Sequence, residues 1–99
     1  MLIEKAKDGD IKTVKLITGE EIICVIKQQN DATITITNPL MFTVSKTTTG
    51  GLNEVIFVPW LISVDRNKDI EISTSKIILI ADSSDISKEK YNEALFSKN

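Results

Sequence analysis

The sequence predicts a mainly β protein: a small, strongly bent antiparallel barrel of about five strands, followed by a C-terminal helix. The first indication is the many short runs of Ile, Val and Leu, because β-branched side chains fit a pleated sheet. The second is the polar turn segments that separate these runs. The third is a change to helical spacing near the C-terminus. An open meander with a helix across it is the competing architecture.

The composition fits one domain over residues 1–99, with the barrel at about 11–81 and the helix at about 87–96. The net charge of −2 argues against a sequence-blind attraction to phosphate backbones. The lack of histidine removes the usual general base and the commonest metal ligand. We therefore expect no enzyme, metal or cofactor. The single Cys24 lies in an apolar run and is expected to be buried.

The expected location of the protein follows from two absences in the sequence. No run approaches the roughly 20 apolar residues that a membrane-spanning helix needs. The first residues include charges where a signal peptide would have its apolar region. We expect a cytoplasmic protein without a membrane partner.

Residues 14–26 are the centre of the predicted sheet. Val14 and Leu16 would share one face of a strand, and Gly19 would permit a tight hairpin turn. Residues 22–26 then form a strand with no polar face. Such a strand is expected to be buried on both sides or bent across a small barrel.

The remaining strands follow from later apolar runs. Residues 33–37 alternate Ile and Thr, and Asn38-Pro39 is expected to interrupt that strand because proline cannot donate to a sheet. After a flexible loop at 46–51, an apolar strand begins at residue 53, and Pro59-Trp60 marks a kink or an edge. Further strand segments are expected at 40–44, 61–64, 70–72 and 77–80, the last of them buried.

The two ends of the chain carry helical signals of different strength. Ser87 is the expected N-cap of the C-terminal helix, with Tyr91 and Leu95 on one face and Ile86 packed on Tyr91 as a hydrophobic staple. Residues 1–10 are ambiguous, and a short N-terminal helix that ends near Gly9 is one solution.

Apolar strands at both ends of the predicted sheet create a problem at its edges. A protein in water must cover such edges or pair them with another chain. Pairing between identical subunits, repeated head to tail, would close a ring. The sequence therefore predicts a homo-oligomer.

This order of elements resembles the Sm/LSm family, whose bacterial branch is Hfq. The turn of the first Sm motif is similar to Leu16-Ile17-Thr18-Gly19, with Cys24 where the family has a second glycine and Asn30-Asp31 near its acidic position. The second motif is similar to residues 72–80, with Ser73-Thr74 in place of an Arg-Gly pair. The likeness covers about residues 11–80. Asn38-Pro39, Val58-Pro59-Trp60 and Tyr91-Asn92 are similar to small Sm-like proteins encoded by marine cyanophages.

The resemblance implies a homo-oligomeric ring that binds single-stranded RNA, or DNA, and acts in RNA processing or regulation, for a phage in the host cytoplasm. In the family, a base lies between the loop joining strands two and three and the loop joining strands four and five. Thr35 stands nearest to the asparagine that the family uses to recognise the base, and Lys76 is a cation for a phosphate. By position, the nucleic-acid-binding residues are Gln29, Asn30, Asp31, Thr35, Ser73, Thr74, Ser75 and Lys76.

The same features have a purely structural interpretation. Asn, Asp, Ser and Thr in turns commonly bond their own backbone, and neither loop holds an aromatic side chain that could stack a base. Trp60 is more often a core or subunit contact than a stacking platform. The alternative function is a structural or protein-interaction module with an Sm-like barrel that does not bind RNA.

Overall fold

The computed structural model describes residues 10–46 and 53–96. The short N-terminal helix considered above, and most of the loop at 46–51, lie outside these residues. The described elements are, in order, β1 (Asp10–Leu16), β2 (Glu21–Gln29), β3 (Thr33–Lys46), β4 (Asn53–Pro59), β5 (Ile70–Ser73), the 3₁₀ helix η1 (Thr74–Lys76), β6 (Ile77–Asp82) and α1 (Asp85–Phe96).

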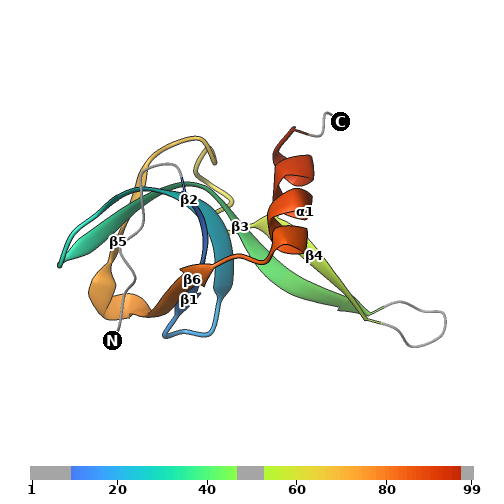
Figure 1. Ribbon diagram of the computed structural model, residues 1–99, viewed down its shortest axis with the longest axis horizontal. Helices are drawn as coiled ribbons and strands as arrows, with labels where there is room; N and C mark the ends of the chain where they lie inside the picture. The colour runs from blue at the N-terminus through green and yellow to red at the C-terminus, as the bar shows by residue number, and fades with distance from the viewer. Residues whose placement is uncertain (1–9, 47–52, 97–99) are drawn as a thin grey trace.

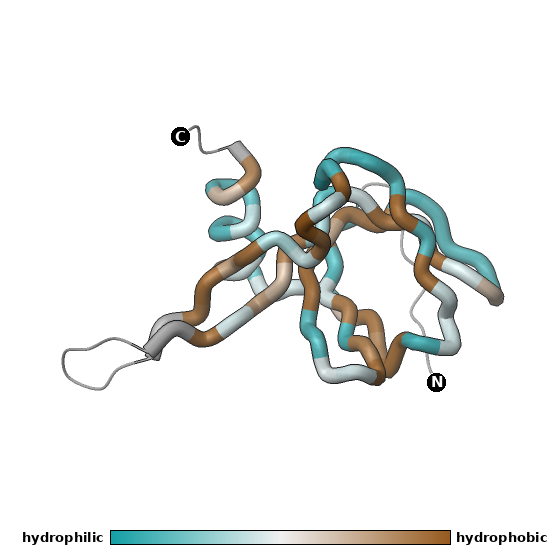
Figure 2. The backbone as a smooth tube through the Cα atoms, turned by 180° about the vertical axis from the view of Figure 1, so that it is seen from behind, coloured by the Kyte–Doolittle hydropathy of each residue, from teal (hydrophilic) through white to brown (hydrophobic). Residues whose placement is uncertain are grey.

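These strands form one antiparallel sheet of six strands in the order β4-β3-β2-β1-β6, with β5 also paired to β3 (Figure 1). The prediction of a mainly β fold with a C-terminal helix is confirmed. The sheet curls around an apolar interior, while the ribbon formed by β4 and the second half of β3 projects away from the curled part (Figure 2). The curled part of the sheet ends at β5 and β6, which η1 joins along the chain. No ladder between β5 and β6 is among the described pairings.

The strand count exceeds the predicted number of about five because the strand that begins at residue 53 and the strand at 70–72 are separate, and both pair with β3. Both β4 and β5 flank the edge of β3 that faces away from β2: β4 pairs with residues 40–46 and β5 with residues 33–36. Residues 60–69 separate them and contain turns and bends only. The predicted strand at 61–64 is therefore wrong. Pro59 ends β4, because its nitrogen has no proton to donate to a further ladder.

The strand β3 bends at Asn38 instead of stopping there, so the predicted interruption is also wrong. Asn38 has φ of 54°, in the left-handed region that asparagine tolerates better than most residues. Its amide donates to the carbonyl of Arg66 at 2.7 Å, and its own carbonyl accepts from the hydroxyl of Tyr91 at 2.7 Å. The bend is thus held by the 60–69 segment and by α1.

The strand β2 is apolar on both faces, as predicted. Ile22, Cys24 and Ile26 are fully buried inside the curled sheet, and Ile23 is fully buried on the outer face. The pairing of β2 with β3 shifts register between Ile23 and Val25 and again between Ile26 and Gln28. Such bulges increase local bending. They allow β2 to bend without the glycine that the Sm pattern has at Cys24.

The helix α1 covers the outer face of the sheet. Tyr91 is fully buried there with Ile23 and Leu40, and Leu95 packs beside them, as the predicted helix face requires. The N-cap is Ser84 and not Ser87, since the Ser84 hydroxyl accepts from the Ser87 amide at 3.1 Å. Ile86 therefore lies in the first helical turn, is 67% exposed, and does not form the predicted staple.

The strand predicted to be buried at 77–80 is partly exposed, and so is the apolar strand β4. On β4, Val55 and Ile56 are exposed, and on β6, Ile78 and Leu79 are exposed. Among the described strands β4 pairs only with β3, and β6 only with β1, so each has an outer edge without a neighbour. The register shift between Lys15 and Leu16 leaves Ile78 as an extra residue in β6. This bulge turns it away from the interior.

Candidate nucleic-acid interface

The two loops predicted to hold a base are brought together by Thr74. Its amide donates to the carbonyl of Ala32 at 2.9 Å, and its hydroxyl donates to the carbonyl of Asp31 at 2.8 Å. The ladder between β3 and β5 adds a pairing of Thr33 with Ser73. Residues 29–32 and 73–76 therefore form one structural unit, which we name the η1 corner.

Asn30 shapes the turn of the η1 corner with its own side chain. Its Oδ1 accepts from the amides of Ala32 at 2.8 Å and Thr33 at 2.9 Å, and its amide donates to the Thr33 carbonyl at 3.0 Å. This is the local bonding that makes asparagine common in turns. The Asn30 oxygen is thus engaged by the backbone before any base arrives.

The serines of the η1 corner are exposed but bonded to each other. The Ser73 hydroxyl caps η1 by accepting from the Ser75 amide at 3.3 Å, and the two hydroxyls lie 2.8 Å apart. Each hydroxyl oxygen has two lone pairs, so both retain capacity for a further hydrogen bond to a ligand. Thr74, by contrast, is buried and acts only within the protein.

Asp31 and Lys76 are the two charged groups of the η1 corner. Both are exposed, and neither side chain has a hydrogen-bond or ion-pair partner among the described residues. The Lys76 carbonyl accepts from the amide of Ile17 at 2.9 Å, which joins η1 to the β1–β2 turn. Lys76 can meet a phosphate as a point charge, while Asp31 can accept from the N–H groups of a base.

Gln29 and Thr35 lie at the margin of the η1 corner. Both are half-buried in strands, and Thr35 is paired with Glu71 of β5 on the outer face, opposite to the inward Ile34 and Ile36. Thr35 therefore does not occupy the position between the two loops that the resemblance implied for a base-recognising residue.

Ile17 is a candidate that the sequence reasoning missed. Its backbone is bonded to η1, and its side chain is 52% exposed beside the Lys76 segment. An exposed aliphatic side chain on a segment that is bonded to η1 offers an apolar surface on which a base can rest. No sequence pattern indicated this role, because Ile17 looks like one more apolar residue in a strand.

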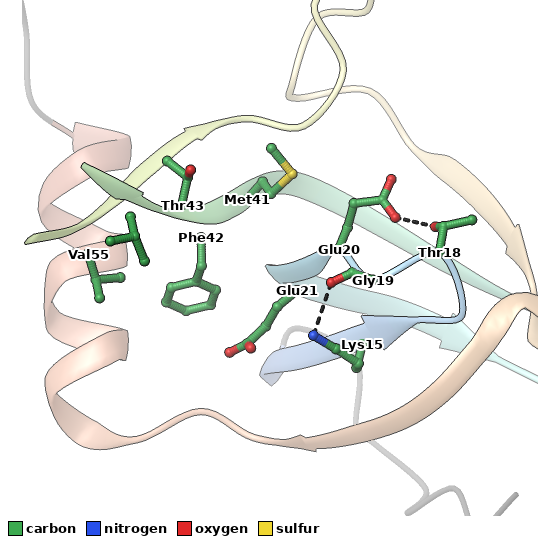
Figure 3. A pocket seen from close by; sticks show the side chains of 10 residues that line it. Lys15, Thr18, Gly19, Glu20, Glu21, Met41, Phe42, Thr43 and Val55 are labelled. Carbon is green, nitrogen blue, oxygen red and sulfur yellow. Dashed lines mark hydrogen bonds between the residues drawn. The ribbon is translucent and has the colours of Figure 1, made fainter. Parts of the chain in front are cut away.

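A separate pocket of about 620 Å³ lies between the β1–β2 turn and the projecting ribbon (Figure 3). Lys15 there donates to the Gly19 carbonyl at 3.0 Å, and Thr18 donates to Glu20, which lowers the pKa of that carboxyl. With Glu20 and Glu21 beside apolar ribbon residues, the pocket disfavours a phosphate. It contains none of the predicted site residues.

The described residues give little indication of other chemistry. They contain no group of three or more His, Cys, Asp or Glu that could hold a metal ion. None of their helices is long and apolar enough to cross a membrane. Burial raises the pKa of the Cys24 thiol to about 12. A comparison of the chain with known protein families and with curated proteins found no match.

Proposed function

We propose that the chain is an Sm-like subunit that assembles into a homo-oligomeric ring and binds single-stranded nucleic acid, with RNA as the preferred class. Its role would be RNA processing or regulation, in the cytoplasm of a host cell if a phage encodes it. The η1 corner is the proposed binding site, with Lys76 on the phosphate and with Asp31, Ser73 and Ser75 toward the base.

The observation that carries this proposal is the joining of the two loops by Thr74. Its two hydrogen bonds fix the Asp31 turn against η1, so the exposed groups of both loops are held beside one another. Because these groups are ordered before binding, less conformational entropy is lost when a ligand binds. A ring then repeats the site once per subunit, and this avidity offsets the low charge of one corner.

The proposed Sm-like barrel and ring are supported by the curled sheet and its open edges. The barrel would consist of β1, β2, the first half of β3, β5 and β6, closed through η1. Among the described strands, the open edges of β4 and β6 lie at opposite ends of the strand order and carry exposed Val55, Ile56, Ile78 and Leu79. If subunits pair these edges, the apolar edges are no longer exposed and cannot serve as sites of aggregation.

A protein-interaction module without RNA binding is the second candidate. The engaged Asn30 oxygen and the buried Thr74 favour it, because they leave few groups to recognise a base. The acidic pair Glu20 and Glu21, at the pocket between the β1–β2 turn and the ribbon, favours it as well, because acidic groups disfavour a phosphate.

Fluorescence anisotropy with short oligo-U and oligo-A over a salt series tests nucleic-acid binding. Lys76→Ala should weaken binding and should reduce the salt slope by about 0.7 for each phosphate that the lysine no longer neutralises. Lys68→Ala removes the same charge from the exposed 60–69 segment and serves as the control. Equal effects of both substitutions, or no binding at low salt, would exclude the η1 corner as the site and favour the second candidate.

Light scattering coupled to gel filtration tests the ring independently of nucleic acid. A mass that is a fixed multiple of the 11.0 kDa chain is expected. A strictly monomeric species at all concentrations would remove the assembly from the proposal and, with it, the avidity on which binding depends.

A further inference from the structure

A groove of about 520 Å³ separates α1 from the projecting ribbon. Phe42 and Phe57 line it, with their rings packed edge to face and their centroids 4.8 Å apart. Val55 and Ile86 also line it and are 63% and 67% exposed. Its polar lining among the described residues is Ser87 and Lys90, with no acidic residue. We name this site the α1 groove. Exposed apolar surface of this kind is a mark of an interaction site.

The α1 groove lies beside the open edge of β4. Val55 and Phe57 belong both to the groove and to that strand, which pairs on its other side with β3. Any strand added to β4 would therefore place side chains next to the groove. The two open edges of the sheet are similar in length, seven residues in β4 and six in β6.

The alternation of inward and outward side chains shows which residues of an added strand would lie on the same face as the groove. Phe57 pairs with Phe42, and both lie on the outer face that α1 covers. On β6, Ile80 pairs with Val14 and points into the interior, whereas Leu79 pairs with Lys15 and lies on the outer face. If β6 of a second copy continued the sheet beyond β4, its Leu79 would emerge on the same face as Val55 and Phe57.

We infer that the α1 groove receives Leu79 from β6 of a second copy of this chain, so that the C-terminal helix takes part in the subunit contact. The inference rests on the proposed ring and adds a specific contact to it. Leu79 is 42% exposed in the single chain and lies next to the exposed Ile78, so the open edge of β6 presents adjacent apolar side chains that assembly would cover.

Polarity favours the same occupant. Within the described part of the chain, Lys90 is the one charged residue that lines the groove, and the outer-face residues of β6 next to it in the proposed contact are the uncharged Leu79 and Ala81. An entering β6 would therefore bring apolar side chains to an apolar lining, while Asp82, on the opposite face of β6, keeps its ion pair with Lys12. The net charge of −2 per chain opposes association of two copies only weakly.

Disulfide trapping tests the contact directly. The variant with Leu79→Cys and Ile86→Cys should form intermolecular disulfides on mild oxidation, visible as a ladder of covalent multimers on a non-reducing gel. The control variant pairs Leu79→Cys with Ile62→Cys, because Ile62 is 96% exposed but does not line the groove. Cys24 remains in both variants, since it is fully buried.

The outcomes separate this inference from the proposed ring. A ladder from the groove pair and none from the control supports the inference. An intact oligomer by light scattering without a ladder, or with equal ladders in both variants, overturns it while the ring stands. A monomer overturns both.

A second substitution avoids the need for oxidation. Ile86→Ser should weaken subunit association at least about tenfold, as expected for an apolar anchor at an interface. Ile86 is exposed in the single chain, so its replacement should leave the fold intact, which circular dichroism checks. Ile62→Ser is the matched control, and a loss of association no greater than in this control would contradict the contact.

Discussion

At the scale of single residues, the polar side chains of the η1 corner divide into two groups. Asn30 and Thr74 use their hydrogen bonds to hold the loops, whereas Asp31 and Lys76 have no partner among the described residues. This division explains how one short segment can be both a turn and the proposed binding site. The structural residues fix the backbone, and the two charged residues remain available to a ligand.

Cys24 gives a prediction at the same scale. Because burial raises the pKa of its thiol to about 12, only about one molecule in 10⁴ carries a thiolate at pH 8, against about a quarter for a free cysteine. The native protein should therefore not react with a disulfide reagent such as DTNB within minutes. It should react fully in guanidinium chloride. Fast labelling of the native protein would mean that β1 and β2 open readily around Cys24.

At the scale of elements, the structure depends on contacts between segments that are distant in the sequence. The helix α1 is tied to the bend of β3 by the hydrogen bond from Tyr91 to the Asn38 carbonyl. Arg66 strengthens the same region, since its side chain donates to the Leu95 carbonyl at 3.2 Å and its own carbonyl accepts from Asn38. The bend, the 60–69 segment and α1 should therefore form and melt together.

The pairing of β1 with β6 predicts a pH dependence. The nearly buried Lys12 ammonium donates a hydrogen bond to Asp82 and attracts it electrostatically, which lowers the pKa of that carboxyl. The stabilisation is therefore fully present above the unfolded pKa of about 3.9 and is lost as the pH falls through the lower folded value.

Chemical denaturation at pH 7 and in acid measures this dependence. The denaturation midpoint should fall in acid, and Asp82→Asn should lower the midpoint at pH 7 and reduce its pH dependence. Asp69→Asn, on the exposed 60–69 segment, is the control. An unchanged pH dependence in Asp82→Asn would show that other carboxylates cause the acid sensitivity.

At the scale of the whole molecule, the sheet carries two cores. The inner one fills the curled sheet, and the outer one lies between the sheet and α1. The outer part of the ribbon belongs to neither, and a two-stranded ribbon is at best marginally stable in water by itself. The exposed Val44, Val55 and Ile56 on it are therefore the part of the chain that gains most from a neighbour.

Because the outer part of the ribbon belongs to neither core, we predict that thermal stability depends on protein concentration. If subunits associate, an increase in concentration of about a hundredfold should raise the Tm by several degrees, since each kcal/mol shifts the Tm of such a domain by about 4–8 °C. Differential scanning fluorimetry over a dilution series measures this shift. Ile86→Ser should show a smaller rise than the unmodified chain. A Tm that does not change with concentration would mean that the ribbon is stable without a partner.

The features that the sequence predicted correctly are those set by local pattern. The two-faced burial of β2, the turn at Gly19 and the helix face of Tyr91 and Leu95 all follow from side-chain periodicity or from backbone freedom at glycine. The cap was misplaced because Ser83, Ser84 and Ser87 are all acceptable by type. Only the position of the helix on the sheet selects Ser84.

The features that it could not predict depend on pairing between distant segments. The pairing of both β4 and β5 with β3 depends on how far β3 extends past β2, and the exposure of Ile17 and Ile78 depends on the turn and the bulge beside them. The candidate site came from the resemblance alone. Turn chemistry correctly suggested that Asn30 would bond its own backbone, but nothing in the sequence placed Thr74 against the Asp31 turn.

The length of β3 has a mechanical consequence. This one strand of 14 residues begins at the η1 corner, where it pairs with β5, and ends in the ribbon beside the α1 groove. A force or displacement applied to the ribbon is transmitted along a single continuous backbone to the corner. If ligand occupancy at one end of β3 changes the affinity of association at the other, thermodynamic linkage requires association to change the ligand affinity by the same factor.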